Sequence, residues 1–248
     1  MPTVNMPTSS MTDRSPYIAI IPARAGSKRL PGKNLLDLAG KPLIVWTIQA
    51  ALESGVFDRV IVSTDSEEIA RMSLGSGAEV PFMRPDRLAE DGTTTADVLI
   101  HAIGELTLPS ESRWTHLACL QPTSPLRTAE NIREAVGLLE DKKADAVISV
   151  CRTEHSPLWS NTLPENLSLD GFIPESVQKT PSQNLPAYYR LNGAIYLCNT
   201  RRFLEEKTLF LRSGAYAYIM SREDSIDIDD RLDFELAGLH LARRYAQG

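Results

Sequence analysis

The sequence predicts an α/β fold with a Rossmann-like, mainly parallel sheet flanked by helices and a small inserted lobe. Short apolar runs alternate with segments of helical apolar spacing between residues 17 and 151, which is typical of parallel strands joined by crossover helices. The alternation stops over residues 152–187, a stretch with many Pro, Ser and Asn residues and little periodicity. It returns after that stretch, so we expect one domain, residues 17–248, with 152–187 as an insertion.

The elements follow in order along the chain. Tyr17–Pro22 is an apolar run of strand length, and 42–54 has helical spacing with Pro42 in its first turn. The next strands are expected at 59–63, 78–82, 116–121 and 146–151, and the next helices at 66–73, 94–106 and 128–142. Thr93 or Thr94 is available to cap the second of these helices. After the insertion, 194–198 and 216–220 predict strands, and 230–245 predicts an amphipathic helix.

Composition limits the class of protein. The 248 residues suit one α/β domain, and the net charge of −6 argues against nucleic acid as a partner. The three cysteines have no metal-site spacing, so we expect buried thiols and a cytoplasmic protein. No apolar stretch approaches the length of a membrane helix, so we expect no membrane association. Residues 1–16 lack an apolar core and are interpreted as a flexible polar tail.

The loop that follows the first strand has the composition of a phosphate-binding site. Residues 23–34 contain two glycines and four cations, and a loop at the carboxyl end of a strand is where open α/β sheets bind ligands. Backbone N–H groups and cations together can hold phosphate. Gly26 and Gly32 have five residues between them, and Asn34 follows Lys33. This spacing excludes the Walker loop, and the dinucleotide-binding fingerprint is also absent.

Several motifs resemble a known family. The loop "IPARAGSKRLPGKN" is similar to the signature loop of the sugar nucleotidyltransferases that use CTP. "LQPTSPLR" (120–127) and "SIDIDDRLDF" (225–234) resemble the acylneuraminate cytidylyltransferases, and "NGAIYL" (192–197) and "IVSTDSEEIA" (61–70) match as well. The resemblance covers residues 17–243. The related ketodeoxyoctonate (KDO) enzymes are a weaker match, because they have "QGDEP" where this chain has "QPTSP".

The resemblance implies which residues bind the nucleotide. Arg24, Ser27 and Lys33 are expected to contact the triphosphate, with Lys33 and Arg24 stabilising the charge of the transition state. Further residues match family positions near the nucleotide, and these are Ala23, Asn34, Arg84 and Thr95.

The "D-I-D" stretch points to a metal by its own chemistry. If the chain is extended there, Asp227 and Asp229 point to one face. Two neighbouring carboxylates are costly unless a cation lies between them, and carboxylate oxygens with nucleotide phosphates suit Mg²⁺. The alternative is that Asp229 or Asp230 caps the final helix. We expect Asp230 and Asp233 to serve that helix dipole, and Asp65 stays open between a turn and the site.

The acceptor side follows from the resemblance alone. Gln121, Asn192 and Tyr196 match positions that contact the sugar. Arg127 is left open between a structural ion pair and the sugar site, and for His155 a structural role is preferred to a catalytic one.

Two positions depart from the family pattern. Sialate-using relatives often carry Lys and Arg where this chain has Trp159 and Ser182, which puts N-acetylneuraminate itself in question as the acceptor. Lys179 or Arg190 could supply a replacement charge.

The resulting hypothesis is a Mg²⁺-dependent enzyme that joins CTP to a nonulosonic acid and acts as a homodimer through residues 152–187. N-acetylneuraminate or a close analogue is the expected acceptor, with legionaminate, pseudaminate and KDO as alternatives. Two other classes remain to be distinguished, namely a glycosyltransferase that consumes a nucleotide-sugar and a nucleotide-binding module without catalysis.

Overall fold

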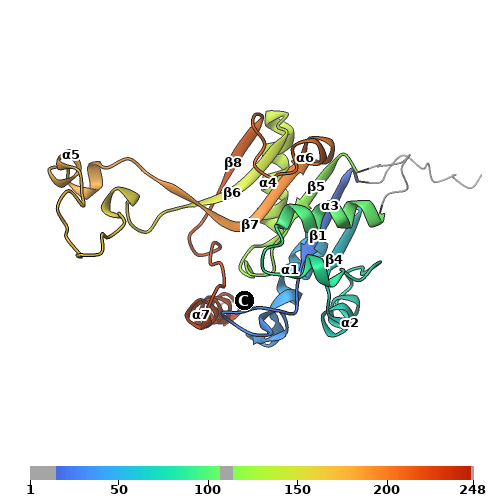
Figure 1. The fold of residues 1–248 in the computed structure, drawn as a ribbon. Coiled ribbons are helices and arrows are strands. Elements are labelled where there is room, and N and C mark those ends of the chain that lie inside the picture. The colour runs from blue at the N-terminus through green and yellow to red at the C-terminus, as the bar shows by residue number, and fades with distance from the viewer. Residues whose placement is uncertain (1–14, 107–113, 247–248) are drawn as a thin grey trace, which may run out of the picture.

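The chain forms a central six-stranded sheet with helices on both faces (Figure 1). In this computed structural model, residues 15–106 and 114–246 are described, so residues 1–14 of the predicted tail lie outside the description. The strand order is β4-β1-β5-β7-β6-β8. The bounds are β1 (Tyr17–Pro22), β4 (Arg59–Ser63), β5 (His116–Cys119), β6 (Ala146–Arg152), β7 (Tyr189–Asn199) and β8 (Ala215–Met220). A small hairpin of β2 (Asp37–Leu38) and β3 (Lys41–Pro42) precedes the first helix.

The sheet is mainly parallel, as predicted. β1 pairs in parallel with β4 and β5, and β6 pairs in parallel with β8. β7 is antiparallel to both of its neighbours, β5 and β6. The carboxyl ends of β1, β4, β5 and β6 therefore lie along one edge, where side chains from distant parts of the sequence meet.

Two apolar layers hold the helices against the sheet. α1 (Leu43–Ser54), α2 (Glu67–Gly75) and α4 (Ala129–Lys142) pack on one face, and α3 (Thr95–Leu106) and α6 (Thr200–Glu206) pack on the other. The alternation within β1 explains this, because Ile18 and Ile20 belong to one layer and Ala19 and Ile21 to the other. α7 (Arg231–Ala246) packs through Phe234 against the start of α1 and β2.

Polar caps set where the helices begin. The Thr128 and Asn131 side chains form a capping box at the start of α4, and the Ser66 side chain accepts a hydrogen bond from the Ile69 N–H at the start of α2. The Thr94 hydroxyl accepts from the Asp97 N–H at 3.1 Å, so Thr94 rather than Thr93 caps α3.

The pairing of β6 with β7 contains a bulge. Ile148 pairs with Tyr196 and Val150 with Leu191, so four residues of β7, 192–195, lie opposite Ser149 alone. The fully buried Asn192 side chain holds this bulge. Its Oδ1 accepts from the Ser149 hydroxyl at 2.6 Å, and its Nδ2 donates to the Ser225 hydroxyl at 2.9 Å. Gly193 has φ +74, a value that glycine adopts without strain.

The segment between β6 and β7 reaches away from the sheet as an arm, as Figure 1 shows. It contains the short helices η3 (Pro157–Trp159), α5 (Glu175–Gln178) and η4 (Ser182–Asn184). Four of its large apolar side chains are exposed, namely Trp159, Leu163, Leu167 and Leu169. Separately, none of the helices in the described ranges is both long enough and apolar enough to span a membrane.

Two expected strands are corrected, and one helix was not expected. The strand predicted at 78–82 is reduced to one isolated bridge between Ile61 and Glu79, because Pro81 has no N–H to continue the pairing. The strand predicted at 116–121 ends at Cys119. α6 was not expected; it begins directly after β7, where the Asn199 side chain accepts from the Arg202 N–H at 3.1 Å.

We expect Asn192→Ala to lower the free energy of unfolding by about 2 kcal/mol, because buried hydroxyl and backbone partners lose their hydrogen bonds. Urea denaturation followed by circular dichroism measures this change. Asn166→Ala, at an exposed position in the arm, is the control and should change stability by less than about 0.5 kcal/mol. Equal stabilities for the two variants would contradict the structural role of Asn192.

Candidate functional site

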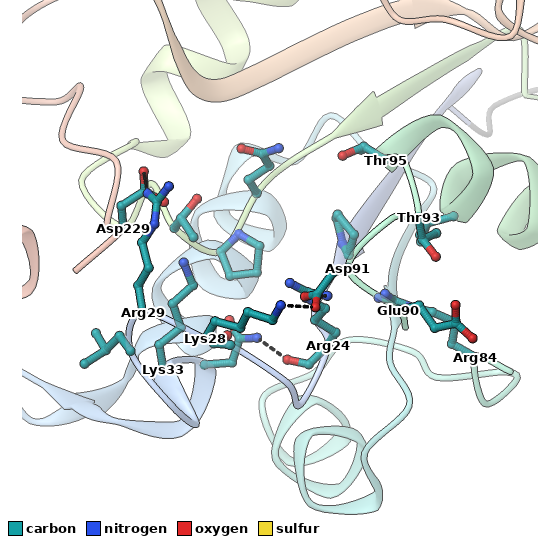
Figure 2. Close-up of a pocket in the computed structure, with 18 of the residues that line it drawn as sticks. Arg24, Lys28, Arg29, Lys33, Arg84, Glu90, Asp91, Thr93, Thr95 and Asp229 are labelled. Atoms are coloured by element: carbon teal, nitrogen blue, oxygen red, sulfur yellow. Dashed lines mark hydrogen bonds and ion pairs between the residues drawn. The ribbon is translucent and has the colours of Figure 1, made fainter. Parts of the chain in front are cut away.

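A cavity of about 540 Å³ lies at the carboxyl edge of the sheet (Figure 2). The loop after β1, the segment between β4 and α3, the turn after β5 and the segment before α7 all contribute to its walls. Most of the predicted site residues line it, namely Arg24, Ser27, Lys33, Asn34, Arg84, Thr95, Gln121, Asp227 and Asp229. The folding of the chain thus brings together groups that are about 200 residues apart in sequence.

The loop after β1 is held by short-range polar contacts. The Asn34 amide donates to the Arg24 carbonyl at 2.9 Å, and the Ala25 N–H donates to the Asp65 carboxylate at 2.9 Å. Asp65, which the sequence left open, therefore holds the loop. Asn34 is buried, and its Oδ1 has no hydrogen-bond partner within the described ranges.

Lys33 joins the loop to the segment that follows β8. Its Nζ donates to the Ile228 carbonyl at 2.8 Å. Burial lowers the pKa of Lys33 below the ordinary value of a lysine, and the nearby Asp227 and Asp229 charges oppose that shift. The ammonium group therefore lies beside both carboxylates of the D-I-D stretch.

Asp227 and Asp229 both face the cavity but differ in environment. Burial raises the pKa of Asp227, and the Asp229 charge adds to this effect, although a hydrogen bond with Thr123 and the Lys33 charge oppose it. Asp229 is exposed and forms an ion pair with Arg29 at 2.8 Å. The side chain of Asp230 caps α7 by accepting from the Leu232 N–H at 2.9 Å.

The donor set fits a divalent cation only in part. Two carboxylates in one cavity, one with a raised pKa caused by burial and by the other, are a pair that a cation would stabilise. Within the described residues, no group of three or more His, Cys, Asp or Glu side chains could hold a metal ion. A cation at Asp227 and Asp229 would therefore take its remaining ligands from a substrate or from water.

Arg84 forms the opposite wall. Its Nε donates to the Ser63 hydroxyl at 3.2 Å and its Nη2 to the Ser63 carbonyl. Burial lowers the pKa of Arg84 to about 10. Thr95, the first residue of α3, lines the same cavity.

Asp91 is a site residue that the sequence analysis missed. Its carboxylate lies 3.1 Å from Arg24 Nη1 and 2.5 Å from Lys28 Nζ, and Figure 2 shows Lys28 extended toward it. The carboxylate therefore neutralises part of the cationic loop. The run "AEDGTTT" that contains Asp91 has the composition of a surface turn, so only the structure reveals this pairing.

The predicted sugar contacts separate into two groups. Gln121 lines the cavity. A Cβ atom added to Gly193 would lie 2.9 Å from the Gln121 Oε1 atom and 3.1 Å from the Asp227 Oδ2 atom, so the β7 bulge lies against both side chains. The structure does not bring Asn192 to the cavity, because its side chain is fully buried in the bulge.

Two other predicted site residues, Tyr196 and Ala23, also lie outside the cavity lining, and so does His155. Tyr196 packs in the core with Phe210 at a ring distance of 6.1 Å, and burial raises the pKa of Tyr196 to about 12. Ala23 is fully buried and donates its N–H to the Ser63 carbonyl at 2.9 Å. His155 is exposed on the arm.

Arg127, which the sequence left open between a structural ion pair and the sugar site, forms no ion pair with the described residues and does not line the cavity. It is fully buried, and its Nη1 donates to the Ala194 carbonyl at 2.7 Å and to the Gln121 carbonyl at 3.3 Å. Trp159 lies on the arm away from the cavity, and so does Lys179, which pairs with Glu175 at 3.5 Å. Arg190 lies 3.4 Å from Glu154 at the base of the arm.

Several known proteins resemble this chain in sequence. The chain matches the family model described as cytidylyltransferase over residues 18–206. It is 40% identical to the N-acylneuraminate cytidylyltransferase of Escherichia coli O18:K1:H7 over 225 residues, which are 90% of this chain and 52% of that protein. It is 38% identical to the CMP-N,N'-diacetyllegionaminic acid synthase of Legionella pneumophila over 228 residues, which are 88% of this chain and 93% of that protein. The chain thus spans about half the length of the first relative.

A similar fold occurs in the structure of CMP:2-keto-3-deoxy-manno-octonic acid synthetase complexed with CTP, with a TM-score of 0.67 and 18% identity. The match covers 92% of this chain and 99% of that one, and at this identity it shows the fold alone. The family match over most of the chain and the near full-length similarity to the Legionella protein agree with the motifs found in the sequence. The chain belongs to the cytidylyltransferase family, as its resemblance to the acylneuraminate cytidylyltransferases predicted.

Proposed function

We propose that this protein transfers the CMP group of CTP to the anomeric hydroxyl of a nonulosonic acid, N-acetylneuraminate or a close analogue. The anomeric oxygen forms a bond to the α-phosphorus, the bond from that phosphorus to the pyrophosphate oxygen breaks, and the hydroxyl loses its proton. One observation carries the proposal: the cationic loop, the two carboxylates and Gln121 line the same cavity. Phosphate, metal and acceptor groups would all be within reach of one another there.

The nucleotide end is assigned to the loop and the Arg84 wall. Arg24, Ser27 and Lys33 would contact the triphosphate, since cations and polar donors meet there. The residues assigned near the remainder of the nucleotide are Ala23, Asn34, Arg84 and Thr95, with Ala23 acting through its backbone because its side chain is buried. Within the described residues the Asn34 Oδ1 atom has no hydrogen-bond partner, so it offers an acceptor to a nucleotide donor group.

Lys33 is assigned to the transition state. Its ammonium group lies between the loop and the carboxylates, where charge would build up on the phosphoryl oxygens and on departing pyrophosphate. Partial burial strengthens its electrostatic effect, because less water screens the charge.

Asp227 and Asp229 are assigned to Mg²⁺ together with phosphate oxygens. A bound magnesium ion would neutralise charge on the triphosphate and help pyrophosphate to leave. The two carboxylates lie on the side of the cavity that contains Gln121 and the Gly193 backbone. We assign this side to the acceptor. Asn192 is assigned to this side through the bulge that its buried side chain holds, and Tyr196 through its packing beneath it.

The first experiment measures pyrophosphate release from CTP and Mg²⁺ with N-acetylneuraminate, legionaminate, pseudaminate and KDO in parallel. We expect release with one nonulosonate above the others, and that acid would be the acceptor of this enzyme. If folded protein released no pyrophosphate with any of the four acids, the proposed reaction would be wrong.

Lys33→Ala should reduce kcat by about 100-fold or more, as loss of a charge-stabilising donor does in other enzymes. The pH dependence gives a second test. Because the pKa of Lys33 is lowered, the wild-type rate should fall with rising pH below the usual lysine range as the ammonium group loses its proton. Lys33→Arg keeps its charge there, so this alkaline fall should be absent from its pH–rate profile. An unchanged alkaline fall in that variant would rule out Lys33 as its source.

Asp227→Asn should lower kcat by about 100-fold and raise the Mg²⁺ concentration needed for half-maximal rate. Asp230→Asn is the matched control, because Asp230 caps α7 and asparagine is also a good cap. Titration of the rate with MgCl₂ compares the two variants. Equal Mg²⁺ dependence in both would remove Asp227 from the metal site.

We further propose a cytoplasmic homodimer. All three cysteines are free and buried, which supports a reducing compartment. At the base of the arm, Leu191 of β7 and Ile219 of β8 flank Val150 of β6 in register, and they are 49% and 58% exposed. This apolar row is continuous with the arm, whose apolar side chains are also exposed, and such patches favour association. A second copy of this chain would cover both.

Ile219→Glu should shift the protein toward monomer in sedimentation velocity at micromolar concentration, because a charge would enter the buried interface. Leu74→Glu is the control, since Leu74 is also exposed but lies on α2, away from the arm. A wild-type protein that sediments as a monomer would exclude the dimer.

A further inference from the structure

Arg127 is a buried cation that the assigned chemistry does not use. Arg127 is only 2% exposed to solvent. Nη1 donates to the carbonyl oxygens of Ala194 and Gln121 at 2.7 and 3.3 Å. The Nε and Nη2 atoms are buried without a hydrogen-bond partner in the described part of the chain.

This arrangement opposes stability. Burial lowers the pKa of Arg127 to about 9, and no carboxylate is among the groups that act on it. A buried charge with no opposite charge beside it destabilises a fold. An apolar side chain of similar size would pack there at a lower cost in free energy. Features that oppose the fold in this way are most often found at functional sites.

The position of the guanidinium gives it a specific task. β5 and β7 pair in antiparallel fashion up to Cys119 and Tyr196, and the pairing ends there. Beyond that point the chain continues through Gln121 on one side and Ala194 on the other. The Arg127 Nη1 atom bridges the carbonyl groups of these two residues, so it joins two segments that no longer pair with each other.

Both joined segments border the acceptor end of the cavity. Gln121 lines it, and Gly193, next to Ala194, lies against the Gln121 and Asp227 side chains. A change in the separation of the two segments would therefore move the Gln121 amide relative to Asp227. The Thr47 hydroxyl and the Ser124 N–H also donate to the Gln121 carbonyl, at 3.4 and 3.3 Å. Arg127 differs from both because the same Nη1 atom also donates to Ala194 of β7 at 2.7 Å.

The nucleotide end is held by other contacts. Arg84 donates to Ser63, and the Arg24 loop is held by Asn34 and by Asp65. None of the hydrogen bonds described for Arg127 reaches these residues. The two ends of the cavity can therefore respond differently to a change at Arg127.

We propose that Arg127 is a positioning residue that holds Gln121 against the Gly193 bulge and so sets the acceptor end of the cavity without touching the substrate. This inference rests on the proposed function, because it assigns Gln121 to the acceptor.

The test compares Arg127→Met, which has no donor, with Arg127→Lys, which can still donate to a carbonyl oxygen. We expect the methionine variant to raise the acceptor KM at least tenfold, while the dissociation constant for CTP stays within twofold. The lysine variant should recover most of that loss. Arg244→Met is the control: Arg244 also donates to a carbonyl of the same turn, Leu126 at 3.0 Å, yet it lies outside the cavity, so both constants should stay within twofold.

A double-mutant cycle with Gln121→Ala separates positioning from general stability. If Arg127 acts through Gln121, Arg127→Met should raise the acceptor KM much less in the Gln121→Ala background than in the wild type. If the two substitutions raised the acceptor KM by factors that simply multiply in the double variant, the inference would be overturned. It would also be overturned if acceptor KM did not change, or if both Arg127 variants lost CTP binding, because the role of Arg127 would then be global.

A crystal structure of Arg127→Met gives a readout that does not need turnover. We expect Gln121 to be displaced or to lose a defined position, while the loop from Arg24 to Asn34 is unchanged. Wild-type protein that is silent with all four acids would refute the proposed function, and this structural comparison would then decide the positioning role alone. An undisturbed Gln121 would overturn it.

Discussion

The buried amide of Asn192 is the interaction on which the Gln121 end of the cavity depends. It binds Ser149 in β6 and Ser225 in the segment after β8, and it stabilises four residues of β7 opposite a single residue of β6. Without that bulge, β7 would continue its regular pairing and Gly193 could not lie against Gln121 and Asp227. The polar network costs little here because each donor and acceptor of the amide finds a partner.

The cavity is lined by positive and negative side chains that neutralise one another only in part. Lys33 lies beside Asp227 and Asp229, Arg29 pairs with Asp229, and Asp91 bridges Arg24 and Lys28. Burial shifts the pKa values of Lys33 and Asp227 toward each other, which is the direction expected when two charged groups lose water together. The groups therefore respond strongly to a further charge, whether from a phosphate or from a cation.

More of the fold than of the site could be predicted from the sequence. β1 and β4 were predicted with their observed bounds, because buried parallel strands are short, continuous apolar runs. The cationic loop and the D-I-D stretch line one cavity, and the place of the loop follows from the end of β1. Asn192 was assigned to the sugar from its motif, and a motif does not reveal the bulge in which the side chain is buried. Asp91 was missed because its partner Arg24 lies 67 positions away in the sequence. The ends of strands and the directions of side chains there depend on tertiary packing.

The pairing of Asp91 with Arg24 and Lys28 has a consequence for how anion binding at this site would respond to salt. A cluster of free cations would be surrounded by mobile anions from solution, and a polyphosphate would have to release them, so binding would weaken steeply with ionic strength. Here part of that counter-charge is a carboxylate fixed to the chain. Binding becomes an exchange in which the protein withdraws its own anion, so fewer dissolved ions are released and the salt dependence is shallower. In the proposed reaction, the same carboxylate would return to the cations when pyrophosphate departs, and its competition would favour product release.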